Sequence, residues 1–174
     1  MIKHSHKKGF TLIETAVYLA LYALIMTGAL LSIYAIFGTN ARNQTKAMLQ
    51  EEGTFFVGKI DWTLTGAQTI NLPLPGTSDD TLSVTKFDVS VGNPVVIAVS
   101  GGNITMSKGG NPAVVLNNSN ITVVCPTAGC FTHTAASGGG INPEGLSTRI
   151  TVYATTSEGM AFSQDFFTVK YLRK

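Results

Sequence analysis

An apolar run near the amino terminus constrains this chain more than any other feature. From Lys7 to Phe37 the sequence reads KKGFTLIETAVYLALYALIMTGALLSIYAIF, and after the two lysines its one charged residue is Glu14. Ala, Leu and other good helix formers fill most of the run. At about 1.5 Å per residue, an apolar helix longer than about 18 residues can cross a hydrocarbon core about 30 Å thick. The sequence therefore predicts one membrane-spanning helix close to the amino terminus.

Glu14 is the anomaly in this helix. An unpaired charge that faces lipid costs about 2.5 kcal/mol or more, so its carboxylate needs either water or a partner cation. One interpretation places Glu14 at the membrane boundary, where the carboxylate stays hydrated. The other gives it a cation within the membrane and makes it a functional contact.

The residues before Glu14 favour the second interpretation. Lys7, Lys8 and Gly9 precede an abrupt change to apolar residues at Phe10, and Glu14 follows Phe10 by about one helical turn. The segment KKGFTLIE resembles the cleavage and methylation signature of type IV prepilins. The resemblance implies that a prepilin peptidase cuts between Gly9 and Phe10 and methylates the new amino group of Phe10. It also implies that Glu14 pairs with this amine on a neighbouring subunit during assembly.

The physical chemistry of such a pair is favourable. A methylated amine remains cationic, and an opposite charge within about 4 to 6 Å favours the ionised carboxylate despite burial. Removing one partner of a well-buried pair typically costs about 3 to 5 kcal/mol. Pairing of Glu14 with Phe10 of a neighbour would therefore set the axial register of subunits.

The first nine residues carry the chain's excess of positive charge. The chain has 12 Lys and Arg against 10 Asp and Glu, and three of those lysines lie in residues 1–9. The remainder is near neutral, so net charge does not support nucleic-acid binding, which needs a concentrated basic face. By the positive-inside rule the lysines place the amino terminus in the cytoplasm and the part after Phe37 outside.

Two other interpretations of the amino terminus stay open. An ordinary signal peptide has an apolar region of about 7 to 15 residues followed by a small-residue cleavage site, whereas here Gly9 precedes a longer run. An uncleaved anchor would keep residues 1–9.

Helical periodicity continues beyond the membrane segment. Leu49, Phe56, Ile60, Leu64 and Ala67 recur at spacings of seven, four, four and three residues, which places them on one helical stripe. We expect this stripe to be buried against the domain that follows. Gly28 and Gly38 are positions where the helix can bend.

Beyond the helix the composition changes to that of strands. Residues 71–80, NLPLPGTSDD, predict a linker, and Thr, Val and Ile then gather in short runs separated by Gly-Gly and Asn-Pro turns. Strands are expected at 81–89, 95–100, 103–107, 113–116, 121–124, 146–155 and 160–172. The predicted class is α+β, with a long amino-terminal helix packed on an antiparallel sheet. The predicted domains are a leader at 1–9, a helix at 10–69 with a membrane half at 10–37 and an amphipathic half at 38–69, and a β-rich head at 70–174.

The rhythm of these strands carries a second resemblance. The stretch VVIAVSGGNITMSKGGNPAVVLNNSNITVV, followed by a loop and by paired strands that end in FFTVKYLRK, is similar to the heads of W-type minor pilins and J-type minor pseudopilins. A major pilin or a competence-type pilin is the other option.

Cys125 and Cys130 are the chain's two cysteines and enclose the sequence PTAG. In a head outside the membrane they predict a disulfide that closes a small loop. A zinc site made by both cysteines and His133 lacks a fourth ligand and the usual spacing. A thioredoxin-like redox pair is disfavoured because the spacing is not C-x-x-C.

The other polar and aromatic residues of the head predict structural roles. Asp79 and Asp80 fall far short of the six to eight oxygen ligands of a calcium site and are expected to be solvated. His133 is expected on the surface, in a polar, Gly-rich connection at 132–144. Core or subunit contacts are expected for Trp62, Tyr153, Phe166 and Phe167.

The sequence shows no Ser-His-Asp, P-loop or paired-carboxylate arrangement, so no enzymatic activity, cofactor or metal is expected. The resemblance implies a structural subunit of a type IV pilus or of a type II secretion-like filament. Its partners would be other pilin subunits, the prepilin peptidase, the cytoplasmic membrane and the pilus assembly platform. The chain would be a single-pass protein of the cytoplasmic membrane before assembly and part of an extracellular or periplasmic filament afterwards. The alternatives are a filament-tip adhesin or DNA-binding minor pilin, and an uncleaved membrane-anchored β domain.

Overall fold

The computed structural model describes residues 11–136, 143–156 and 159–172. Contacts within the chain divide it into two compact units, Met1–Arg42 and Asn43–Lys174. Helix α1, Leu12–Leu64, contributes its first part to the first unit and its last part to the second.

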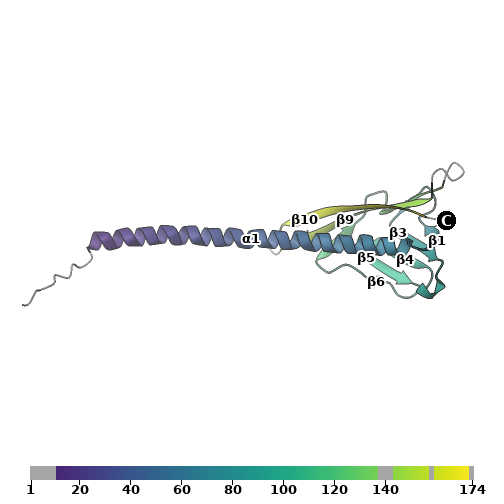
Figure 1. The fold of residues 1–174 in the computed structure, drawn as a ribbon, viewed down its shortest axis with the longest axis horizontal. Coiled ribbons are helices and arrows are strands. Elements are labelled where there is room, and N and C mark those ends of the chain that lie inside the picture. The colour runs from purple at the N-terminus through teal and green to yellow at the C-terminus, as the bar shows by residue number, and fades with distance from the viewer. Residues whose placement is uncertain (1–10, 137–142, 157–158, 173–174) are drawn as a thin grey trace, which may run out of the picture. The chain divides into compact units, whose positions relative to one another are not determined.

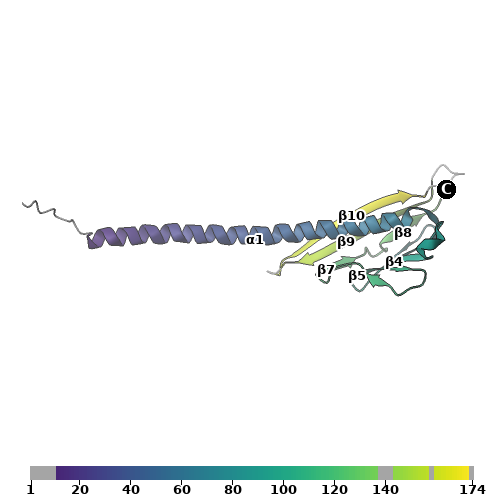
Figure 2. The same ribbon diagram turned by 60° about the horizontal axis from the view of Figure 1, so that its bottom comes forward.

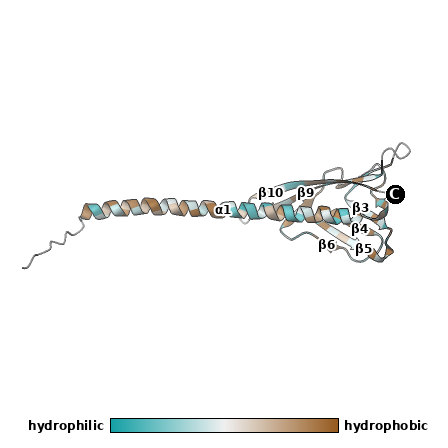
Figure 3. Cartoon of the chain, viewed as in Figure 1, coloured by the Kyte–Doolittle hydropathy of each residue, from teal (hydrophilic) through white to brown (hydrophobic). Residues whose placement is uncertain are grey.

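In the first unit, α1 is one unbroken helix. It continues through Gly28 and Gly38, since a single glycine costs only about 1 kcal/mol in a helix. Residues 11–37 are all exposed. Within the described residues, α1 is the one helix long and apolar enough to cross a membrane. Figure 3 shows its first part predominantly hydrophobic and its last part mixed.

The carboxyl end of α1 lies earlier than the predicted boundary at 69. α1 ends at Leu64, and Gly66 follows with a φ of 70°, a conformation that favours glycine. The amide of Phe87 then donates to the carbonyl oxygen of Gly66 over 3.0 Å, and β1, Ala67–Leu72, pairs with β3. The predictions of helix to 69 and of a linker starting at 71 were wrong, because pairing with a distant strand outweighs the helical periodicity.

The second unit contains two antiparallel sheets (Figures 1 and 2). One has the order β1-β3-β4-β5-β6, and the other has the order β10-β9-β8-β2, with β7 also paired to β9. The remaining strands are β2 Ser78–Asp79, β3 Thr81–Lys86, β4 Val95–Ser100, β5 Asn103–Lys108, β6 Val114–Val115, β7 Ile121–Val124, β8 Phe131–Thr134, β9 Gly145–Thr155 and β10 Ala161–Tyr171. The predicted α+β class is confirmed, with two sheets where one was expected.

Several strand predictions hold and others fail. Gly101 and Gly102 have φ values of 58° and 82° and join β4 to β5 in the two-residue hairpin that the sequence predicts. The strand expected at 81–89 ends at Lys86, and Val89–Val91 form a short 3-10 helix. Strands β2 and β8 were missed because each is short and pairs with strands that are distant in the sequence.

Strand β9 organises the second sheet. It pairs with β10 along its whole length on one side, from Thr155 opposite Ala161 to Gly145 opposite Tyr171. On the other side β8 covers its first residues and β7 its last. The segment between β7 and β8 therefore loses its hydrogen-bonded pairing with β9, and the chain pairs with β9 again at β8.

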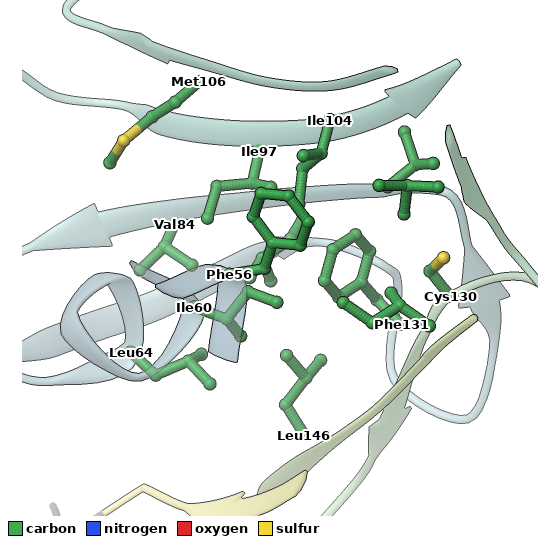
Figure 4. Packing of buried hydrophobic residues seen from close by; sticks show 14 of the residues in the cluster. Phe56, Ile60, Leu64, Val84, Ile97, Ile104, Met106, Cys130, Phe131 and Leu146 are labelled. Atoms are coloured by element: carbon green, nitrogen blue, oxygen red, sulfur yellow. The ribbon is translucent and has the colours of Figure 1, made fainter. Parts of the chain in front are cut away.

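The core of the second unit is the α1 stripe, which lies between the two sheets. Phe56 and Ile60 are fully buried, and Leu49 and Leu64 nearly so. Figure 4 shows Phe56, Ile60 and Leu64 packed with Val84, Ile97, Ile104 and Met106 of one sheet and with Phe131 and Leu146 of the other. Ala67, the last member of the predicted stripe, is also buried, although it lies in β1. Burial of the predicted stripe is confirmed.

Strand β10 also packs on α1. The ring of Phe166 lies against Gly53, where the Cβ of any larger residue would come within 2.0 Å of it. The ammonium of Lys170 donates to the carboxylate of Asp61. Alternate residues of β10 are half-buried and exposed, so the strand presents one face to α1 and the other to solvent.

Neighbouring phenylalanines of α1 give a direct test of this packing. Phe56→Ala should lower the free energy of unfolding of the head by about 3 to 5 kcal/mol, because it opens a cavity in a closed core. Phe55→Ala, the matched control at an exposed position, should cost less than about 1.5 kcal/mol. Urea unfolding of the detergent-solubilised chain, followed by the fluorescence of Trp62, measures both. Equal losses for the two variants would contradict the assigned core.

Candidate functional site

The amino-terminal motif is described from Thr11 onward, so Gly9 and Phe10 lie outside the described residues. Thr11 caps α1: its hydroxyl oxygen accepts a hydrogen bond from the amide of Glu14 over 3.3 Å, and its carbonyl oxygen accepts one from the amide of Thr15 over 3.1 Å. Glu14 thus lies in the first turn of α1, where a negative charge is favourable beside the helix amino terminus. The pattern T-x-x-E is that of a capping box, which the sequence analysis missed, and the bond from the Glu14 amide to Thr11 is its threonine half.

The threonine and serine side chains of α1 that follow Glu14 bond within the helix. Thr15, Thr27, Ser32 and Thr39 each donate to the carbonyl four residues earlier, over distances of 2.8 to 3.0 Å. These groups therefore need no partner outside the helix. Glu14 remains the one charged side chain between residues 11 and 37, and it is exposed on this chain.

Cys125 and Cys130 form the predicted disulfide. It closes the excursion between β7 and β8, where residues 125–130 leave the ladder opposite Arg149 and Ile150 of β9. The amide of Arg149 donates to the carbonyl oxygen of Cys130 over 2.9 Å and restores pairing at the far end of the loop. The disulfide thus brings the chain back into register for β8.

Asp80 bonds to this loop, and Asp79 bonds within its own turn. An oxygen of Asp80 accepts a hydrogen bond from the amide of Cys130 over 3.1 Å, and one of Asp79 accepts from the amide of Thr81 over 2.9 Å. Asp80 is exposed, as expected for a solvated loop charge, and Asp79 is half-buried; both carboxylates also accept backbone hydrogen bonds. Asp80 and both cysteines lie close enough together to suggest a metal site, but sulfur atoms in a disulfide are not thiolate ligands.

His133 corrects another expectation, since its side chain is 1% exposed and not on the surface. Its Nδ1 atom lies 2.7 Å from the carbonyl oxygen of Pro73, and its Nε2 atom lies 2.9 Å from a carboxylate oxygen of Glu144. The ring joins β8 to two loops that are distant in sequence. The polar segment 132–144 suggested a solvated connection, and only the tertiary structure gives the ring its partners.

The structure also gathers residues that the sequence analysis treated separately. The ammonium groups of Lys86 and Lys108 lie 3.7 and 4.4 Å from the centre of the Trp62 ring. Lys86 is 6% exposed, and its ammonium donates to the carbonyl oxygen of Trp62 over 2.7 Å. Trp62 and Lys59 are neighbours on α1, whereas Lys86 and Lys108 come from β3 and β5, which are distant in the sequence.

Charge and burial act together on Lys86. Desolvation lowers its pKa below the ordinary value of 10.5, and the charge of Lys108 lowers it further. Lys170 acts in the same direction, while Asp88 raises the pKa and only partly offsets these effects. The folded head therefore holds a buried cation whose neutral form is favoured relative to the unfolded chain.

Lys108 and Lys59 lie at one end of a groove that runs along α1 beside β5 and Leu116. One cavity of about 340 Å³ is lined by Phe55, Lys59, Trp62 and Lys108, and another of the same volume is lined by Phe55, Leu116 and the carboxylates Glu51 and Glu52. Phe55 lines both cavities, so they lie next to each other along α1, and together they are called the groove here. Burial raises the pKa of Glu52, and the charge of Glu51 raises it further. The groove thus has an aromatic centre, a basic end and an acidic end.

Comparisons of this chain with protein-family models, with curated proteins and with solved structures give no match. Its own geometry shows a long apolar amino-terminal helix, antiparallel sheets packed on the last part of that helix, and a disulfide. This arrangement is compatible with the pilin-like fold that the KKGFTLIE segment implies.

The depressed pKa of Lys86 predicts a pH dependence of stability. Between the folded pKa and 10.5 the unfolded chain binds more protons, so the free energy of unfolding should rise with pH as it approaches 10.5. Lys86→Met should lose this contribution, whereas Lys59→Met, which removes a lysine charge from the neighbouring helix face, should keep it. Urea unfolding at several pH values between about 8 and 10.5 measures the difference. Parallel pH profiles for wild type and Lys86→Met would contradict the assignment.

Proposed function

We propose that this chain is a structural subunit of a filament of the type IV pilus or type II secretion kind. In this proposal a prepilin peptidase removes residues 1–9 and methylates Phe10, and the subunit waits in the cytoplasmic membrane with its head outside. Residues 10–37 then pass from lipid into contact with other subunits. The chain is a substrate of the peptidase and has no catalytic role of its own.

One observation carries the proposal: residues 11–37 form an apolar helix that the chain itself leaves entirely exposed, with one carboxylate in its first turn. Such a surface needs lipid or other helices around it. Glu14 is the one charged side chain between residues 11 and 37, so it is the group that requires a counter-charge in an apolar setting. Cleavage before Phe10 would create that counter-charge on every copy of the chain.

Glu14 has two candidate roles, and matched variants separate them. If Glu14 pairs with the amine of Phe10 on a neighbour, Glu14→Gln should abolish or reduce by about tenfold or more the amount of subunit in sheared filaments, since it removes the charge. If Glu14 only caps α1, Glu14→Gln should be tolerated, because glutamine also serves a capping box. Thr11→Ala, which removes the cap and keeps the charge, should leave most of the filaments.

The filament yield has to be read together with the membrane level of each variant. Immunoblots of membrane and sheared fractions, with the amino-terminal sequence of the membrane form, show whether a variant is made and processed. A normally processed Glu14→Gln subunit that enters filaments at the wild-type level would contradict the pairing. Gly9→Arg should block cleavage and leave the chain in the membrane, which is the behaviour of an anchored β domain.

A further inference from the structure

The head carries a second exposed apolar surface, distinct from the groove beside α1. It lies on the solvent face of β9 and β10, and we call it the outer patch: Arg149, Tyr153, Asp165, Phe167, Val169 and Tyr171. Phe167 is 62% exposed and Tyr171 is 58% exposed. Because the alternate residues of β10 pack on α1, Phe167 points away from that helix. The outer patch and the groove share no residue, and in Figure 1 β10 lies on one side of α1 and β6 on the other.

The two surfaces share one arrangement of charges around an aromatic ring. In the groove, Phe55 is 42% exposed and has Glu51 one helical turn before it and Lys59 one turn after it, each about 6 Å away along the axis. The ammonium of Lys59 lies 5.2 Å from the centre of the Phe55 ring.

In the outer patch, Phe167 has Asp165 about 7 Å away along β10 and Arg149 directly opposite on β9. The guanidinium of Arg149 lies 5.8 Å from the centre of the Phe167 ring. The hydroxyl of Thr151 donates to the carboxylate of Asp165 over 2.7 Å, which holds the acidic group in place before any contact forms. Each surface therefore presents an exposed ring with a carboxylate and a cation beside it, on opposite sides of Phe55 along α1 and at about a right angle around Phe167.

From this complementarity we infer that the groove of one copy receives the outer patch of the next, an inference that rests on the proposed filament. Phe167 would enter the groove beside Phe55, with Asp165 toward Lys59 and Lys108 and with Arg149 toward Glu51 and Glu52. The contact joins two different surfaces, so every copy keeps one of each free for another neighbour. Contacts of this kind form open-ended rows of subunits.

The same charges argue against a nucleic acid in the groove. Glu51 and Glu52 at one end would repel phosphates. At the other end, the ring of Trp62 already has the ammonium groups of Lys86 and Lys108 against it, so it is not a free platform for stacked bases. A bipolar protein surface satisfies both ends of the groove at once.

Disulfide cross-linking in assembled filaments tests the contact, because both native cysteines are already paired. A full-length chain with Phe55→Cys and Phe167→Cys should give a ladder of covalent multimers when sheared filaments are oxidised and run without reductant. Each single variant should stay monomeric. The pair Ser119→Cys with Phe167→Cys, in which the first cysteine lies on an exposed loop and lines neither cavity, should also stay monomeric.

Charge reversal in the cross-linking chain gives an independent readout. Lys59→Glu or Asp165→Lys alone should lower the yield of multimers by about tenfold, since like charges then oppose docking, and the two together should restore it.

The outcomes of these tests separate the inference from the proposed function. Filaments of the double-cysteine chain that form without covalent multimers would overturn this inference without contradicting the proposed function. Dimers of Phe55→Cys alone would overturn the two-surface pairing. Retention of a single-stranded oligonucleotide by the wild-type head, lost in Lys108→Glu, would replace the second copy with a nucleic acid. Absence of wild-type filaments would contradict the proposed function itself.

Discussion

The two parts of helix α1 need different surroundings, and the rest of the structure depends on how each part is covered. From Leu49 to Leu64 one stripe of its surface is buried between two sheets, and that burial holds the sheets together. From Leu12 to Phe37 the same helix is apolar on every side and finds no cover on its own chain. Folding of the head covers the stripe from Leu49 to Leu64. The part from Leu12 to Phe37 is covered only by lipid or by other chains, and this requirement points to assembly.

Much of the fold follows from local pattern. The spacing of Leu49, Phe56, Ile60 and Leu64 predicted the buried face of α1, and Gly101-Gly102 predicted the hairpin between β4 and β5, because both depend on neighbours in sequence. The end of α1 and the short strands β1, β2 and β8 were missed because their stability comes from partners far along the chain. Hydrophobic period alone does not reveal such pairings.

The residues of the candidate site also divide into those that could be predicted from local sequence and those that could not. Cys125 and Cys130 are close in sequence, so their pairing could be predicted, whereas the burial of His133 between Pro73 and Glu144 could not. The grouping of Lys86 and Lys108 around Trp62 depends on the placement of β3 and β5 against α1. The cap at Thr11 is different, because the T-x-x-E pattern was present in the sequence and was read only as part of an assembly motif.

The central claim is that removal of residues 1–9 turns a membrane helix into an assembly element with its own counter-charge for Glu14. Mass spectrometry of the intact protein and of its amino-terminal peptide, taken from native membranes and sheared filaments, tests this claim most directly. We expect a chain that begins at a methylated Phe10 in both fractions. A chain that retains Met1 to Gly9 in cells with an active prepilin peptidase would contradict it.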